Sequence, residues 1–349
     1  MRASRIYGVS ALLGILLLPL TGFGHHSFAT TFDRNSVVER EGEIMEVLWQ
    51  NPHVNFTLKT VDSTGEEVLW VIESHSLSIM RRMDLENAFI QVGDNVRLAG
   101  NPARRTDLRR MFVHNILLPT GEEWVFRVGA TPADLRWSDR LMGTADRWFA
   151  IEGESSPQAR GIFRVWSTSF ASRGTGWVPR REEVLTASAQ AALTSFDTAR
   201  EAPLANCKPK GMPWIMQQPY PMEFVEDGDQ ILIRIEEYDL VRTVHMDSAT
   251  SDESPAASLL GFSTGSWQGE TLVVQTTGVN YPYYDERGMP VGDGAEYLER
   301  FTPTEDGRRL NYAITITDPA TFTESVHSQR DWIWLSDVSV EPYNCVSGA

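Results

Sequence analysis

The chain has little cysteine, a shortage of positive charge and a single apolar run, and each shortage excludes a class of function. Of its 349 residues, 31 are basic and 47 are acidic, so the formal net charge is −16 at pH 7. Phosphate backbones and anionic membrane surfaces repel such a chain, and we therefore expect no nucleic-acid partner. Outside residues 9–20, no stretch approaches the length that spans a bilayer, so we expect no stable membrane insertion.

The N-terminus has the pattern of a secretory signal. Two arginines, Arg2 and Arg5, precede the apolar run, and small residues follow at Gly22 and Gly24. Cleavage after Gly24 would leave His25-His26-Ser27-Phe28 as the mature start, whereas a rival cleavage after Ala29 would discard both histidines. The pattern predicts a signal peptide over residues 1–24 and a periplasmic or secreted protein.

Only two cysteines occur, Cys207 and Cys345, and both lie in the C-terminal half. In an oxidising compartment an even pair is most simply a disulfide. The alternative is a pair of soft metal ligands, but closely spaced cysteine or histidine neighbours are missing. We expect the disulfide.

Residues 25–120 read as five short strands with one helix. Alternating runs cover residues 42–49, 53–59, 68–72, 94–100 and 111–118, and a short helix is expected over Ser76 to Leu85. Five strands with a helix between the third and fourth predict a small OB-like barrel. Residues 121–160 have mixed composition and are interpreted as a connector.

Residues 161–349 predict a second β domain. One helix is expected over Leu185 to Ala199, and glycine-centred turns join alternating runs into an antiparallel meander of roughly eight strands. A meander of that length usually closes on itself, which hides its edge strands. The predicted fold is therefore mainly β, an OB-like small barrel followed by a lipocalin-like antiparallel β-barrel.

Several motifs carry a resemblance. They are His25-His26-Ser27-Phe28, Trp49-Gln-Asn-Pro-His53, Gly261-Phe-Ser-Thr-Gly-Ser-Trp267-Gln-Gly-Glu-Thr-Leu-Val-Val274 and Leu298-Glu-Arg-Phe301. On these the chain resembles a family of exported bacterial proteins of unknown function. The resemblance implies the architecture and export, and it implies no reaction.

The histidines of the first domain are candidate metal ligands. A free α-amine beside the His25 imidazole would form a chelating pair for a metal such as copper, and His53 or His114 would supply a further nitrogen. His114 shares a face of its strand with Phe112 and Ile116, which would point it inward. The alternative is that Asn51-Pro52-His53 forms a turn whose side chains cap backbone groups.

Charged residues of the second domain are the candidate catalytic groups: Glu299, Arg300, Arg242 and Glu270. Glu299 and Arg300 are adjacent on a strand and face opposite ways, so one of them should face the barrel interior, where Arg242 or Arg234 could pair with Glu299. Such a pair is either structural, or a carboxylate with a raised pKa that acts as general acid or base.

Aromatic residues of the second domain are the candidate ligand-binding groups. The loop Tyr281-Pro-Tyr283-Tyr284 and the segment Trp332-Ile-Trp334 could form the mouth of a pocket, together with Trp267. Aromatic strand residues are also common in cores.

These features predict an exported protein that holds a small apolar molecule in its C-terminal barrel. The first alternative is a cofactor-free enzyme, a lyase, isomerase or hydratase, that uses acid–base chemistry in the same cavity. The second alternative is a periplasmic copper-binding protein that uses the N-terminal histidine, with copper as its cofactor.

Overall fold

A computed structural model describes most of the chain beyond the predicted signal. The described residues are 28–83, 85, 89–126, 130–142, 161–168, 182–197, 207–246, 256–336 and 338–346. The predicted signal peptide and the candidate ligand His25 lie outside them. None of the described helices is long and apolar enough to cross a membrane.

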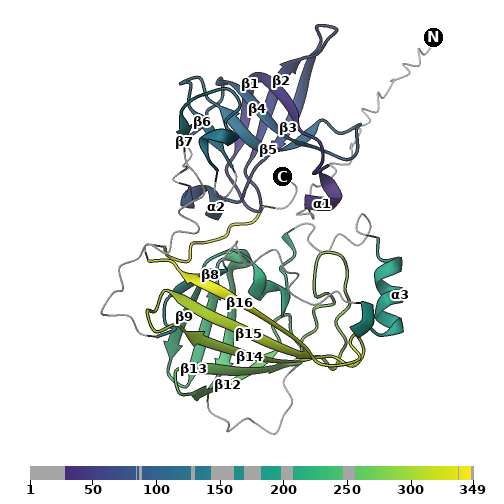
Figure 1. The fold of residues 1–349 in the computed structure, drawn as a ribbon, viewed down its shortest axis with the longest axis vertical. Coiled ribbons are helices and arrows are strands. Elements are labelled where there is room, and N and C mark those ends of the chain that lie inside the picture. The colour runs from purple at the N-terminus through teal and green to yellow at the C-terminus, as the bar shows by residue number, and fades with distance from the viewer. Residues whose placement is uncertain are drawn as a thin grey trace, which may run out of the picture.

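The first unit is a closed five-stranded barrel (Figure 1). Its strands pair in the order β3-β2-β1-β4-β5, and a parallel pairing of β3 with β5 closes the ring. This confirms the predicted small barrel, with one helix between the third and fourth strands. The elements are α1 (Phe28–Thr31), β1 (Val38–Leu48), β2 (Asn55–Val61), β3 (Glu67–Glu73), α2 (Leu77–Arg82), β4 (Asn95–Pro102) and β5 (Arg110–Leu117).

Alternation builds the core of this barrel, because one face of every strand points inward. The inward positions carry buried apolar side chains, among them Ile44, Phe56, Ile72 and Leu98. Within residues 121–160, β6 (Glu123–Val125) and β7 (Leu141–Met142) extend the sheet beyond β5, and the 3-10 helix η1 (Pro132–Asp134) lies between them.

The second unit is a closed barrel of nine strands, in the order β10-β11-β12-β13-β14-β15-β16-β8-β9. This confirms the predicted second barrel. Its strands are β8 (Val165–Thr168), β9 (Met222–Asp227), β10 (Gln230–Ile235), β11 (Leu240–His245), β12 (Phe262–Gln268), β13 (Thr271–Thr277), β14 (Glu296–Pro303), β15 (Arg309–Thr317) and β16 (Val326–Trp334). The helical elements are η4 (Glu182–Val184), α3 (Ala187–Ser195), η6 (Trp214–Gln217) and η7 (Glu237–Asp239).

One pairing differs from the predicted antiparallel meander. Strands β11 and β12 run parallel, with Val244 opposite Ser263. Parallel neighbours need a long crossover connection, and the chain between His245 and Phe262 supplies one.

The C-terminal tail and α2 join the two barrels (Figure 1). Cys345 forms a disulfide with Cys207, as predicted, and the Cα atoms lie 5.9 Å apart across a sequence separation of 138. The same tail reaches the first barrel, where the Asn51 side chain donates to the Tyr343 carbonyl (2.5 Å). The Val346 amide donates back to the Asn51 carbonyl (3.1 Å). The tail therefore binds both units.

We expect the paired Cys207→Ser and Cys345→Ser substitutions to lower the free energy of unfolding by about 2–5 kcal/mol, because the disulfide closes a long loop in the unfolded chain. Denaturant unfolding of the oxidised protein and the double variant measures this. Thiol labelling of denatured, unreduced protein should modify no cysteine, and two labelled thiols per chain would contradict the pairing.

Candidate functional site

A buried ion pair lies inside the second barrel. Glu299 of β14 and Arg242 of β11 are 0 % and 1 % exposed. Arg242 Nη1 donates to Glu299 Oε1 (3.0 Å), and Nη2 donates to Oε2. Arg242 also donates to Ser263 Oγ (3.1 Å) and Thr276 Oγ1 (2.7 Å). The Tyr312 hydroxyl donates to Glu299 Oε1 (2.8 Å). The pair is thus held on every side by hydrogen bonds.

This bonding favours a structural ion pair over a general acid or base. The Glu299 carboxylate accepts three hydrogen bonds, two from Arg242 and one from Tyr312, and these hold it in place. Burial, followed by the nearby charge of Glu299, raises the pKa of Tyr312 well above its usual range, so the phenol stays a hydrogen-bond donor. Arg234 does not reach Glu299, since it pairs with Glu223 (2.8 Å) near the surface.

The other two predicted catalytic residues do not join this cluster. Arg300 follows Glu299 on β14 and faces outward, where its guanidinium donates to Gln268 Oε1 (3.0 Å). Glu270 is exposed in the turn between β12 and β13. Of the four predicted catalytic residues, only Glu299 and Arg242 therefore contact each other. Alternation along β14 points Arg300 to the opposite side of the strand from Glu299.

The predicted ligand-binding aromatic residues do not form one pocket mouth. Tyr281 and Tyr284 are buried, and Tyr284 donates to Asp318 Oδ2 (2.9 Å). Tyr283 is half-buried, with its ring 5.3 Å from that of Phe196. Trp267 is 44 % exposed on a different segment.

Trp332, which the sequence suggested for the mouth of a pocket, is buried instead. This tryptophan is 0 % exposed and packs inside the barrel, with ring centroids 5.0 Å from Tyr312 and 5.9 Å from Phe301. Its position on β16 is in phase with Val326 and Arg330, both of which are buried. Because side chains alternate along a strand, this phase points Trp332 inward.

In the first barrel, His53 lies beside a buried carboxylate. Its Nε2 is 3.6 Å from Glu73 Oε1, and its Nδ1 is 3.0 Å from the Ser74 carbonyl oxygen. Glu73 also binds the Arg110 guanidinium. The backbone register Asn55↔Glu73 explains the contact, since it brings the start of β2 beside the end of β3.

Two further histidines flank the ring of Phe112, which is the backbone partner of Glu73. The ring centroid of His75 lies 5.3 Å and that of His114 lies 6.3 Å from Phe112. His75 Nε2 is 3.3 Å from the Phe126 carbonyl oxygen. His53, Glu73, His75 and His114, with Phe112, form what we call the histidine face.

His114 does not share a face with Ile116, which corrects the sequence prediction. The β4–β5 register shifts between Ala99 and Gly100, so Val113 pairs with Gly100 and Asn115 with Ala99. His114 is the extra residue of this bulge, and bulges turn a side chain away from its expected direction. Ile116 consequently enters the core, while His114 lines a cavity of about 500 Å³.

The N-terminal arm docks at the histidine face. In α1, the Phe28 ring lies 5.0 Å from Phe112 in an edge-on contact, and Phe32 lies 5.8 Å from it. Backbone bonds fix the segment further, because Asp33 N donates to the Pro102 carbonyl (2.9 Å). Phe28 is the first residue that the structure describes.

His75 was not among the predicted ligands, since it forms no regular spacing with another histidine. The pairing of two strands was a signal that could have identified His75. His53 precedes β2 and His75 follows β3, and antiparallel neighbours bring those two ends together. Within the described ranges, no three histidine, cysteine, aspartate or glutamate side chains group closely enough to hold a metal. A metal site at this face therefore needs a donor from elsewhere.

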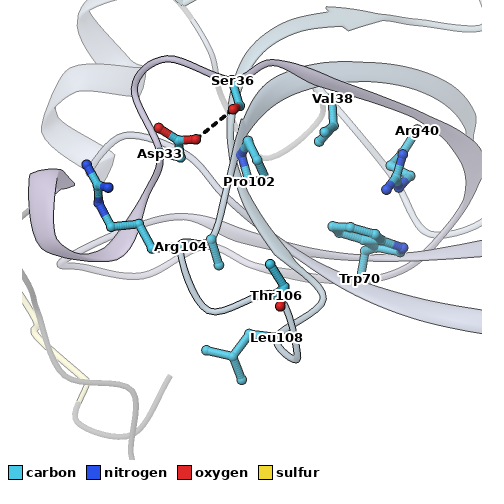
Figure 2. Close-up of a pocket in the computed structure, with 10 residues that line it drawn as sticks. Asp33, Ser36, Val38, Arg40, Trp70, Pro102, Arg104, Thr106 and Leu108 are labelled. Carbon is cyan, nitrogen blue, oxygen red and sulfur yellow. Dashed lines mark hydrogen bonds between the residues drawn. The ribbon is translucent and has the colours of Figure 1, made fainter.

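A separate hollow of about 400 Å³ lies between β1, β3 and the loop that joins β4 to β5 (Figure 2). The Arg40 guanidinium lies 4.1 Å over the Trp70 ring and so occupies the face that a ligand ring would use. Ser36 Oγ donates to Asp33 (2.6 Å) at the other end. No predicted site residue lines this hollow, whose walls are Asp33, Ser36, Val38, Arg40, Trp70, Pro102, Ala103, Arg104, Thr106 and Leu108.

We expect Glu299→Ala to lower the free energy of unfolding by about 3–5 kcal/mol, because it leaves Arg242 buried without its counter-charge. The double variant Glu299→Leu with Arg242→Met should lose less than Glu299→Ala alone. Arg300→Ala, on the outer face of the same strand, is the matched control and should change stability by no more than about 0.5 kcal/mol. Equal losses for Glu299→Ala and Arg300→Ala would contradict the buried pair.

A family model matches the N-terminal part of the chain. A model of a family of unknown function, DUF6152, matches residues 15–110, a range that includes the His-His-Ser-Phe and Asn-Pro-His motifs. No curated protein matches the chain. The N-terminal part of the chain is thus similar to a family that has no assigned activity.

Proposed function

We propose that the chain is an exported protein whose mature N-terminus, His25, binds copper at the histidine face. The observation that carries this proposal is the docking of the arm. Phe28 packs on Phe112, and the same ring contacts His75 and His114.

Chain length supports the proposal. Two residues separate His25 from Phe28, so the chain takes three Cα–Cα steps between them, and at most about 3.6 Å per step gives a reach of roughly 10 Å. The ring of His75 lies 5.3 Å from Phe112, itself 5.0 Å from Phe28. The His25 amine and imidazole are therefore within reach of the histidine face, where they would supply the donor that the described residues lack.

Hydrogen bonding of the ring nitrogens also supports it. A metal-bound histidine commonly donates its other ring N–H to a carbonyl or carboxylate, which fixes the tautomer. His53 Nδ1 and His75 Nε2 each lie within hydrogen-bond distance of a backbone carbonyl. When His75 donates its Nε2–H to that carbonyl, its Nδ1 carries the lone pair, whereas His53 Nε2 lies 3.6 Å from Glu73 Oε1. Imidazole and amine nitrogens are ligands that Cu(II) prefers.

Export is part of the same proposal, since only cleavage after Gly24 would leave His25 with a free α-amine. The signal-like N-terminus and the disulfide support an oxidising destination, the periplasm or the exterior. No step of the proposal requires a membrane anchor.

We expect protein that starts at His25 to bind one Cu(II) ion. Calorimetry and electron paramagnetic resonance would measure this binding. One alanine added before His25 should weaken binding by more than tenfold, because the amine leaves its chelating position. His75→Phe should weaken it too, and His327→Phe, on the far barrel, is the matched control. Binding should fail as pH falls below about 6.5, since the imidazoles must be deprotonated.

Two results would overturn the copper proposal. One is a mature start at Thr30 in protein purified from its native host. The other is equal copper affinity in the extended variant and in protein that starts at His25, which would show that the amine is not a ligand.

A second candidate function concerns the second barrel, which we propose takes up a small molecule. The supporting observation is its mixed interior, where the aromatic cluster of Phe301, Tyr312 and Trp332 lies beside the charged pair of Arg242 and Glu299. Such mixtures of apolar walls and a few polar groups are typical of ligand sites. The saturated bonding of Glu299 favours binding over the acid–base enzyme alternative.

A further inference from the structure

One buried positive charge of the second barrel has no counter-charge. Arg330 of β16 is 8 % exposed, and among the described residues Tyr312 is the group whose charge acts on its guanidinium. Among the described residues of this unit, every other buried charged side chain has a polar partner. Lys210 binds Glu237, Arg242 binds Glu299, the Glu341 amide donates to Glu236, and Tyr284 donates to Asp318.

Arg330 faces the interior of the barrel. Its backbone partner is Tyr312 of β15, which carries an inward phenol, and the next inward residue along β16 is Trp332. The indole N–H of Trp332 is buried as well and has no acceptor among the described residues. The Arg330 guanidinium and the unpartnered Trp332 N–H therefore occupy successive inward positions of one strand.

Electrostatics makes this arrangement costly for the protein alone. Burial lowers the pKa of the Arg330 guanidinium, but arginine stays charged at neutral pH. The pair of Arg242 and Glu299 is neutral overall, and the Tyr312 phenol stays protonated, so neither offsets the charge of Arg330. A largely buried guanidinium without a counter-charge is destabilising unless water or an anion joins it.

We infer that the second barrel binds a small organic carboxylate whose carboxyl group is held by Arg330. This inference rests on the second proposed function and names the chemistry of its ligand. A planar carboxylate matches the fork of N–H donors on a guanidinium, and the Trp332 N–H is a further donor nearby. The apolar part of the ligand would lie against the aromatic and aliphatic interior.

The test is a calorimetric titration of the full chain with paired probes, 2-naphthoate and decanoate against their neutral amides. We expect both carboxylates to bind at least tenfold more tightly than the matching amides. Arg330→Met should remove that preference, while Arg330→Lys should retain part of it. Arg300→Met removes the same charge from the outer face and should leave the affinities unchanged.

Thermal unfolding gives a second readout that also reports folding. Carboxylate should raise the unfolding midpoint of the natural protein and not that of Arg330→Met. Without probe, Arg330→Met should unfold at a higher temperature than the natural protein, because the unpaired charge is gone.

The outcomes separate the inference from the function on which it rests. If amides bind as tightly as carboxylates and Arg330→Met binds both, the barrel takes small molecules and the carboxylate assignment is wrong. If no probe binds or shifts the midpoint, both the second proposed function and the inference are overturned.

Discussion

Closure of each sheet into a barrel is the constraint on which the rest of the structure depends. A parallel pairing of β3 with β5 closes the first ring, and the antiparallel pairing of β9 with β10 closes the second. Closure leaves every strand with one face inward and one outward. Whether a side chain points into the barrel or out of it therefore depends on its position in the alternation along the strand. A polar residue in the inward phase then needs a partner inside the barrel, as Arg242 has in Glu299.

Alternation also explains how much of the fold the sequence could predict. The strand over 94–100 and the helix over 76–85 correspond to β4 and α2, because turn residues and periodicity mark their ends locally. The parallel β11–β12 pair was missed, since which strands become neighbours depends on the whole barrel. The bulge at His114 was missed for a similar reason: one extra residue changes the phase without changing the local pattern.

The candidate sites were predictable in part. The sequence predicted that either Glu299 or Arg300 faces the barrel interior. The alternation of inward and outward positions along the strand could identify which of the two does. The isolation of Arg330 could not be predicted, because it depends on which buried residues already have partners. His75 was missed because its position next to His53 comes from the β2–β3 register and not from any spacing along the chain.

The turn at Asn51-Pro52-His53 links the two units to the histidine face. The simple interpretation of this motif, a turn whose side chain caps backbone groups, holds for Asn51, which donates to the Tyr343 carbonyl (2.5 Å) and accepts from the Leu77 amide (3.0 Å). His53, two residues later, faces Glu73. The tail that holds Asn51 is itself bound to the second barrel through Cys345. The position of a candidate ligand in the first barrel is thus fixed partly by the disulfide of the second, which accounts for one short motif serving both structure and the proposed site.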